Sequence, residues 1–222
     1  MIPLPENQYQ RNKYSENGDP SGVRYLGDVR NIISERMLAF RCDQPTEAMG
    51  NCFPYAVMQQ LHRPQIRSTL SEEMKHLSEN CHDLRTSIVQ FVKRITPTSQ
   101  YYPLINESRN QWILAIGNDW DQRLELMSTD RQWFDDQFMQ FTAWFLKRDI
   151  ICYTINWTKK FCASAVDRPC SFREMAPCNC AAEPLHIANV TNVHYQSLLP
   201  IETPEINTTS NTQQNKSNSM RH

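Results

Sequence analysis

Apolar positions recur every three or four residues over most of the chain up to residue 147, a spacing typical of amphipathic helices. Residues 29–40 carry Ile32, Ile33, Met37 and Phe40 in this pattern. The polar residues 41–49 predict a loop that leads into a Gly50-Asn51 turn, and a helix is expected from Cys52 to about residue 62. Four more helices are predicted, two between residues 66 and 93, one with breaks over 107–126 and one over 134–147.

The pattern changes after residue 149. Residues 150–155 form a short apolar, β-branched run typical of a buried strand, and residues 185–189 and 194–198 are two more predicted strands. Helices therefore come first and strands late, without the regular alternation of a doubly wound sheet. The sequence predicts an α+β fold in which helices flank a small central β-sheet.

The two ends differ in composition from the rest of the chain. Residues 1–22 are rich in Asn, Gln, Pro, Ser and Gly, and residues 202–222 are rich in Thr, Asn, Gln and Ser. Such segments bury too little apolar surface to fold, so both are expected to be disordered tails. A single domain is predicted between them, over residues 23–201.

Composition and charge narrow the classes of partner. The net charge is −1 and the Lys and Arg residues are scattered, which disfavours a nucleic-acid binder. No stretch approaches the roughly 18 apolar residues that a membrane span needs. The N-terminal residues do not resemble a secretory signal, so the eight cysteines are expected to be reduced. We therefore expect a monomer inside the cell, in the cytoplasm or alternatively in the nucleus.

Cys52 follows the Gly50-Asn51 turn and opens a predicted helix. The free amides at a helix N-terminus lower the pKa of a thiol and can hold an oxyanion. Gly50 would let the backbone turn sharply and approach a substrate carbonyl. A cysteine in front of an apolar helix is, however, more often a buried core residue, so Cys52 alone does not establish a nucleophile.

His194 lies in a late predicted strand, about 140 residues after Cys52. A histidine in a strand is most often structural. A cysteine in a glycine turn paired with a distant histidine is nevertheless the usual arrangement of a thiol protease, in which the imidazole takes the thiol proton.

Several segments resemble the OTU (ovarian tumour) cysteine proteases. Gly50-Asn51-Cys52 followed by an aromatic residue and Ala56 is similar to the family's nucleophile motif, and His194-Tyr195-Gln196-Ser197-Leu198 is similar to its histidine strand. Three further segments occur in the same order as in the family. The first is Leu84-Arg85 with Ile88 and Phe91, the second is Asp130-Arg131-Gln132-Trp133, and the third is Arg148-Asp149-Ile150. The resemblance spans about residues 37–200.

The resemblance implies a papain-like α+β deubiquitinase, which would cleave the bond after the C-terminal glycine of ubiquitin or a ubiquitin-like protein. It implies no cofactor and no metal. Cys52 would be the nucleophile and His194 the general base. The turn of Met49, Gly50 and Asn51 would contribute to the oxyanion hole.

Two positions depart from the family pattern. Met49 stands where the family has an aspartate, and Gln196 stands where it usually has the aspartate or asparagine that orients the histidine. The family position makes Gln196 the first candidate for a third catalytic residue. Asn189 and Asn192 are alternatives, and Asp43 and Glu47 in the loop before Cys52 are others.

Two functions of other classes remain open. The departures at Met49 and Gln196 suggest an OTU-fold module that binds ubiquitin without cutting it. A second cluster, Cys170, Cys178, Cys180 and His186 with Cys162 upstream, suggests a zinc-stabilised interaction protein. Its spacing lacks the usual pair of cysteines separated by two to four residues, and a loop between two strands is the simpler interpretation.

Overall fold

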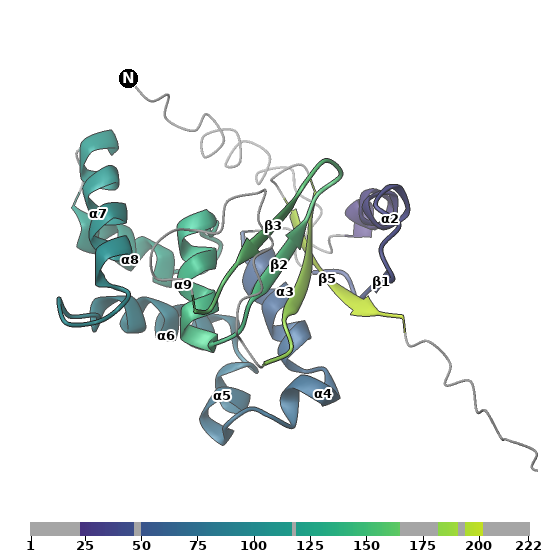
Figure 1. Cartoon of the computed structure of the whole chain (residues 1–222), viewed down its shortest axis with the longest axis horizontal. Coiled ribbons are helices and arrows are strands. Elements are labelled where there is room, and N and C mark those ends of the chain that lie inside the picture. The colour runs from purple at the N-terminus through teal and green to yellow at the C-terminus, as the bar shows by residue number, and fades with distance from the viewer. Residues whose placement is uncertain (1–22, 47–49, 117–118, 165–181, 191–193, 202–222) are drawn as a thin grey trace, which may run out of the picture.

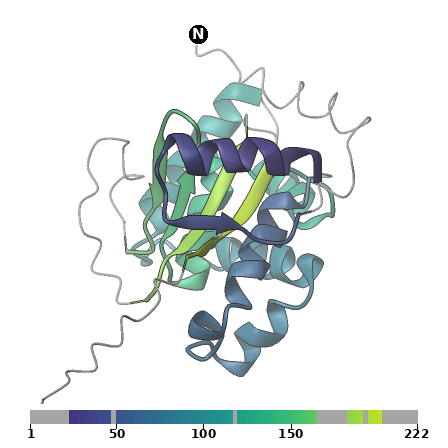
Figure 2. The same ribbon diagram turned by 90° about the vertical axis from the view of Figure 1, so that its right-hand side faces the viewer.

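We describe the protein from a computed structural model, for residues 23–46, 50–116, 119–164, 182–190 and 194–201. A five-stranded sheet lies at the centre, with helices on both faces (Figure 1). Helix α2 (Leu26–Glu35) lies across one face, as Figure 2 shows, and most of the other helices lie on the opposite side. The predicted α+β class, with a small central sheet flanked by helices, is confirmed. The tails predicted over residues 1–22 and 202–222 lie outside the described residues.

The helical part of the chain precedes most of the sheet, as the sequence predicts. A short 3-10 helix, η1 (Val23–Tyr25), leads into α2. The other helices are α3 (Cys52–Leu61), α4 (Pro64–Arg67), α5 (Glu72–Leu77), α6 (Cys81–Lys93), α7 (Tyr102–Ile116), α8 (Trp120–Ser128) and α9 (Asp136–Leu146). Side chains cap several N-termini, for example Asn80 on α6 and Asp135 on α9, and so satisfy amides that the helix leaves free.

The sheet has the strand order β1-β5-β4-β2-β3. Its strands are β1 (Phe40–Cys42), β2 (Ile150–Tyr153), β3 (Thr158–Phe161), β4 (Leu185–Val190) and β5 (His194–Pro200). Strands β2 and β4 pair in parallel, and the other three pairs are antiparallel. The antiparallel β4–β5 pair aligns Asn189 with Tyr195 and Val190 with His194, which fixes the face of the sheet that each side chain occupies.

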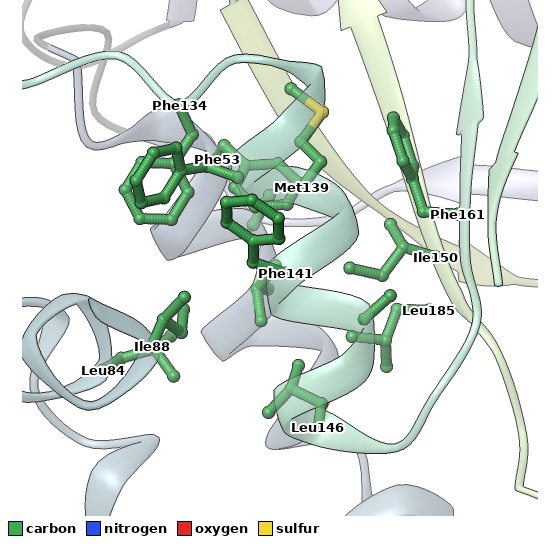
Figure 3. Packing of buried hydrophobic residues seen from close by; sticks show 14 of the residues in the cluster. Phe53, Leu84, Ile88, Phe134, Met139, Phe141, Leu146, Ile150, Phe161 and Leu185 are labelled. Carbon is green, nitrogen blue, oxygen red and sulfur yellow. The ribbon is translucent and has the colours of Figure 1, made fainter. Parts of the chain in front are cut away.

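The main hydrophobic core lies between the sheet and the helices α3, α6, α8 and α9. Figure 3 shows Phe141 and Met139 of α9 near Phe53 of α3 and near the strand residues Ile150 and Phe161. A smaller core lies under α2 on the other face, where Val29 and Ile32 pack with residues of β2, β4 and β5. The sheet is therefore buried on both faces.

The helix expected over residues 29–40 ends earlier. Helix α2 stops at Glu35, and Met37 adopts a left-handed backbone conformation with φ 47°, which a helix cannot continue through. Phe40 belongs instead to strand β1, whose other two residues, Arg41 and Cys42, were expected to be in the loop. Strand β3 was also not predicted, because Thr158-Lys159-Lys160-Phe161 is short and largely polar.

Between residues 66 and 147, helices lie where the sequence predicts them, but there are more of them than predicted. The interval 66–93 holds the two predicted helices, α5 and α6, and the last residues of the short α4, which was not predicted. The predicted break within 107–126 falls between α7 and α8. None of the helices within the described ranges is both long and apolar enough to cross a membrane.

His186 on β4 should make the stability of the protein depend on pH. Burial, and then the charge of Arg63, lower the pKa of His186 from 6.5 to about 4. As the pH falls from 6.5 to 4, the unfolded chain binds a proton at this residue that the folded protein does not bind. The free energy of unfolding should therefore fall by roughly 2 to 3 kcal/mol over this window and level off below it.

Urea denaturation at a series of pH values checks this expectation. His186→Gln should remove most of the extra slope between pH 6.5 and 4, whereas the same change at the exposed His76 should leave it. An unchanged slope in the His186 variant would contradict the assignment.

Candidate active site

Cys52 begins helix α3, as the sequence predicts, and its side chain is fully buried. The thiol accepts a hydrogen bond from the backbone of Tyr195 on β5, the residue next to His194. Phe53 packs edge-on against the Tyr195 ring, with 5.5 Å between the ring centroids. Two segments about 140 residues apart thus meet at the start of α3.

Burial dominates the electrostatics of the Cys52 thiol. It raises the pKa of Cys52 to about 12, while hydrogen bonds from the Tyr195 and Phe53 backbone and the charge of Arg85 act in the opposite direction. The sequence-based expectation of a lowered thiol pKa is therefore wrong for the free protein, because desolvation outweighs the helix amides. The thiol is protonated at neutral pH until a base or a bound substrate changes its surroundings.

Gly50 has the backbone conformation that the sequence analysis proposed for it, with φ +85°. A Cβ atom at this position would lie 2.1 Å from the carbonyl oxygen of Arg131. The turn before Cys52 therefore needs glycine both for its torsion angle and for its close approach to the backbone of Arg131.

A buried arginine holds this turn in place. Arg85 of α6 donates from Nη2 to the Gly50 carbonyl at 2.7 Å and from Nε to the Asn51 side-chain oxygen at 2.9 Å. It also donates to the carbonyls of Met127 and Gln132. The Arg131 amide donates to the same Asn51 oxygen at 3.0 Å. Asn51 thus ties the turn to two other segments.

Sequence reasoning gave Arg85 no role in the site. One signal was available, since Arg85 stands beside Leu84 on the apolar stripe of α6, where a charge must find partners. Those partners are carbonyl and amide oxygens of the turn and of the segments around it. Arg85 is therefore both a support for the turn and a buried positive charge that acts on Cys52.

His194 opens β5 and is fully buried. Its ring stacks on Tyr25 of η1, with centroids 4.4 Å apart and an interplanar angle of 14°. Its Nε2 atom lies 3.2 Å from the hydroxyl of Thr46. Neither Tyr25 nor Thr46 was foreseen, because both belong to segments whose position against β5 cannot be read from the sequence.

Gln196 lies two residues further along β5 and on the same face as His194. Its Oε1 accepts a hydrogen bond from the Thr46 amide at 3.1 Å, and its Nε2 donates to the Gln44 carbonyl at 2.6 Å. These bonds fasten the loop before Cys52 to the strand that carries His194. A direct role of Gln196 in orienting the imidazole stays a prediction.

The remaining candidate residues fall in different places. Asn189 is buried on β4 opposite Tyr195, on the face that α3 covers. Asp43 accepts a hydrogen bond from the Ser197 hydroxyl at 2.9 Å, further along β5. Met49, Asn192 and Glu47 lie outside the described residues.

The zinc cluster cannot be assembled from the part of the chain described. Cys162 is buried after β3, and His186 places Nδ1 3.0 Å from the Tyr153 hydroxyl. No group of three His, Cys, Asp or Glu side chains among the described residues could hold a metal ion. Cys170, Cys178 and Cys180 lie outside those residues, so the zinc alternative stays a prediction.

Comparison with known proteins gives matches only at the level of structure. No family model matches the sequence, and no curated protein matches it. An OTU deubiquitinase from Wolbachia pipientis is 15% identical with a TM-score of 0.48, over 74% of this chain and 90% of that one. The OTUD1 OTU domain is 12% identical with a TM-score of 0.47, over 79% and 96% of the two chains. The Hazara virus OTU, solved bound to ubiquitin, is 18% identical with a TM-score of 0.41, over 74% and 83%.

Each of these structures is an OTU domain.

Proposed function

We propose that this protein is a thiol isopeptidase that removes ubiquitin, or a ubiquitin-like modifier, from other proteins. The observation that carries the proposal is the contact of Cys52, at the start of α3, with the β5 backbone beside His194. The motif resemblance of both segments to the OTU proteases supplies the substrate class. No cofactor takes part in the proposed reaction.

The proposed chemistry proceeds in two halves. His194 takes the proton of the Cys52 thiol, and the sulfur attacks the carbonyl of the modifier's C-terminal glycine. Backbone amides of the turn at Gly50, Asn51 and Cys52 stabilise the oxyanion. The imidazolium then protonates the departing lysine amine, which leaves a thioester on Cys52. A water molecule, deprotonated by His194, hydrolyses that thioester and regenerates the thiol.

Because the pKa of the Cys52 thiol is raised in the free protein, the proposed mechanism requires substrate binding to activate the thiol. A protonated, fully buried Cys52 does not react with passing electrophiles, because the thiolate is the nucleophile. Transfer of the proton to His194 becomes favourable only when substrate is bound. The thiolate of the resulting ion pair can then attack the substrate carbonyl, whose oxygen becomes the oxyanion. We therefore expect Cys52 of the free protein to react slowly with small alkylating agents.

Hydrolysis of ubiquitin carrying a C-terminal fluorogenic amide tests the proposal. The wild-type protein should release the fluorophore, with or without a metal chelator, and lose this activity after alkylation under denaturing conditions and refolding. A chelator-sensitive activity, or no hydrolysis of ubiquitin and ubiquitin-like substrates by folded protein, would contradict it.

A ubiquitin-binding module without catalysis is the second candidate. It is suggested by Met49, where the family has aspartate, and by Gln196, where the family usually has aspartate or asparagine. Titration of labelled ubiquitin separates the two. Saturable binding with no hydrolysis would favour the binding module over the enzyme.

A further inference from the structure

Thr46 joins the loop before the nucleophile to the histidine strand. Its side chain is buried, with 1% of its surface exposed. Its hydroxyl donates a hydrogen bond to the Tyr195 carbonyl and lies 3.2 Å from Nε2 of His194. One small polar side chain thus contacts both the backbone and the imidazole of the same strand segment.

The number of hydrogens on the Thr46 hydroxyl decides which group donates in the hydrogen bond between Thr46 and Nε2 of His194. A threonine hydroxyl carries one hydrogen, and a carbonyl oxygen can only accept, so that hydrogen points to Tyr195. Towards His194 the Thr46 oxygen can then only accept. The Nε2 atom must therefore carry a hydrogen, which leaves Nδ1 as the basic nitrogen of the neutral ring.

The position of Thr46 is itself fixed from two sides. Its amide donates to Oε1 of Gln196 at 3.1 Å, and Nε2 of Gln196 holds the Gln44 carbonyl at 2.6 Å. At the start of the same loop, the Asp43 amide donates to the Ser197 carbonyl at 3.1 Å and the Ser197 hydroxyl donates to the Asp43 carboxylate. The loop is thus fastened along β5 by bonds that do not involve His194.

The Tyr25 ring restrains the remaining freedom of the imidazole. Stacking at 14° fixes the plane of the His194 ring, and a hydrogen bond at Nε2 fixes its rotation within that plane. Together they define the direction in which Nδ1 points.

We infer that Thr46 is the positioning residue of His194, which sets the imidazole tautomer with hydrogen on Nε2 and presents Nδ1 as the proton acceptor. Gln196 acts one step further away by holding Thr46. The inference rests on the proposed function for its catalytic meaning, whereas the tautomer is a property of the free protein.

Nitrogen NMR of the histidine side chains tests the tautomer without any substrate. In wild-type protein labelled with 15N-histidine, at mildly alkaline pH where imidazoles are neutral, the His194 ring should carry its hydrogen on Nε2. The His194→Gln variant identifies which resonances belong to this ring. Hydrogen on Nδ1 in the wild type would overturn the inference, whether or not the protein hydrolyses ubiquitin.

Three variants separate positioning from stability. Thr46→Val removes the hydroxyl at nearly constant volume and should lower kcat by about tenfold or more while shifting the His194 tautomer equilibrium. Thr46→Ser keeps the hydroxyl and should stay within about threefold of the wild-type kcat. Thr142→Val removes a fully buried hydroxyl that donates to the Phe138 carbonyl in α9, and is the matched control for lost stability.

The outcomes are distinct. A folded Thr46→Val protein with wild-type kcat and an unchanged tautomer overturns the inference. An equal loss of activity in Thr142→Val also overturns it, since the effect would then be one of stability. If the wild type does not hydrolyse ubiquitin, the proposed function fails while the tautomer measurement still decides the role of Thr46.

Discussion

Cys52→Ala should reduce hydrolysis of ubiquitin substrates to the background rate and leave the protein folded. The thiol is the only group in the proposed mechanism that forms a covalent bond to the substrate, so no neighbouring side chain can replace it. Because Cys52 is fully buried, its loss leaves a small cavity, and the free energy of unfolding should fall by about 1 to 2 kcal/mol. Kinetics and urea denaturation of the same preparation measure both effects.

Cys152→Ala is the matched control for this variant. Cys152 on β2 is also buried, with 3% of its surface exposed, and burial raises the pKa of its thiol as well. Removing it should cost similar stability and leave hydrolysis intact. Undiminished hydrolysis by Cys52→Ala would contradict the proposed mechanism. A comparable loss of hydrolysis in both variants would show that disturbed core packing, not a missing nucleophile, causes the loss.

Gly50→Ala should be the most destabilising single change in the site. The φ of +85° is strained for any L-residue, and the added Cβ would lie 2.1 Å from a backbone oxygen that cannot move aside cheaply. We expect a loss of about 3 kcal/mol or more in the free energy of unfolding, together with at least a tenfold loss of kcat/KM. The catalytic loss follows because Arg85 and Asn51 align the same turn.

Gly27→Ala provides the contrast. Gly27 lies in α2, where an added Cβ would meet no atom within 4 Å. Alanine favours the helix over glycine, so the free energy of unfolding should rise by roughly 0.5 to 1 kcal/mol. Equal effects of the two substitutions in denaturation experiments would refute the strained turn at Gly50.

The start of α3 could be predicted because local signals agree there. A glycine turn precedes an apolar run of helical period, and both determine local structure directly. The strand at His194 was also predicted, as one of the late short segments, and its resemblance to the histidine strand of the OTU proteases singled it out. These two elements carry the proposed nucleophile and base, so the sequence located both segments, while the catalytic roles stay a prediction.

The supports of the site could not be predicted, because each depends on a contact between distant segments. Thr46 lies in a polar loop whose sequence has no regular period, and only the pairing of β1 with β5 brings it to His194. Arg85 was assigned to a central helix without a role, since its partners belong to three other segments. The pKa of Cys52 was misjudged because the sequence suggests both a helix terminus and a buried thiol and does not show that burial has the larger effect.

The most direct test of the central claim is labelling by a ubiquitin probe that bears an electrophile at its C-terminus, followed by mass spectrometry of the modified peptide. We predict one covalent adduct per chain, located at Cys52, formed faster than with a small alkylating agent and absent in Cys52→Ala. Folded wild-type protein that forms no adduct with ubiquitin or ubiquitin-like probes, or forms it at another cysteine, would contradict the claim.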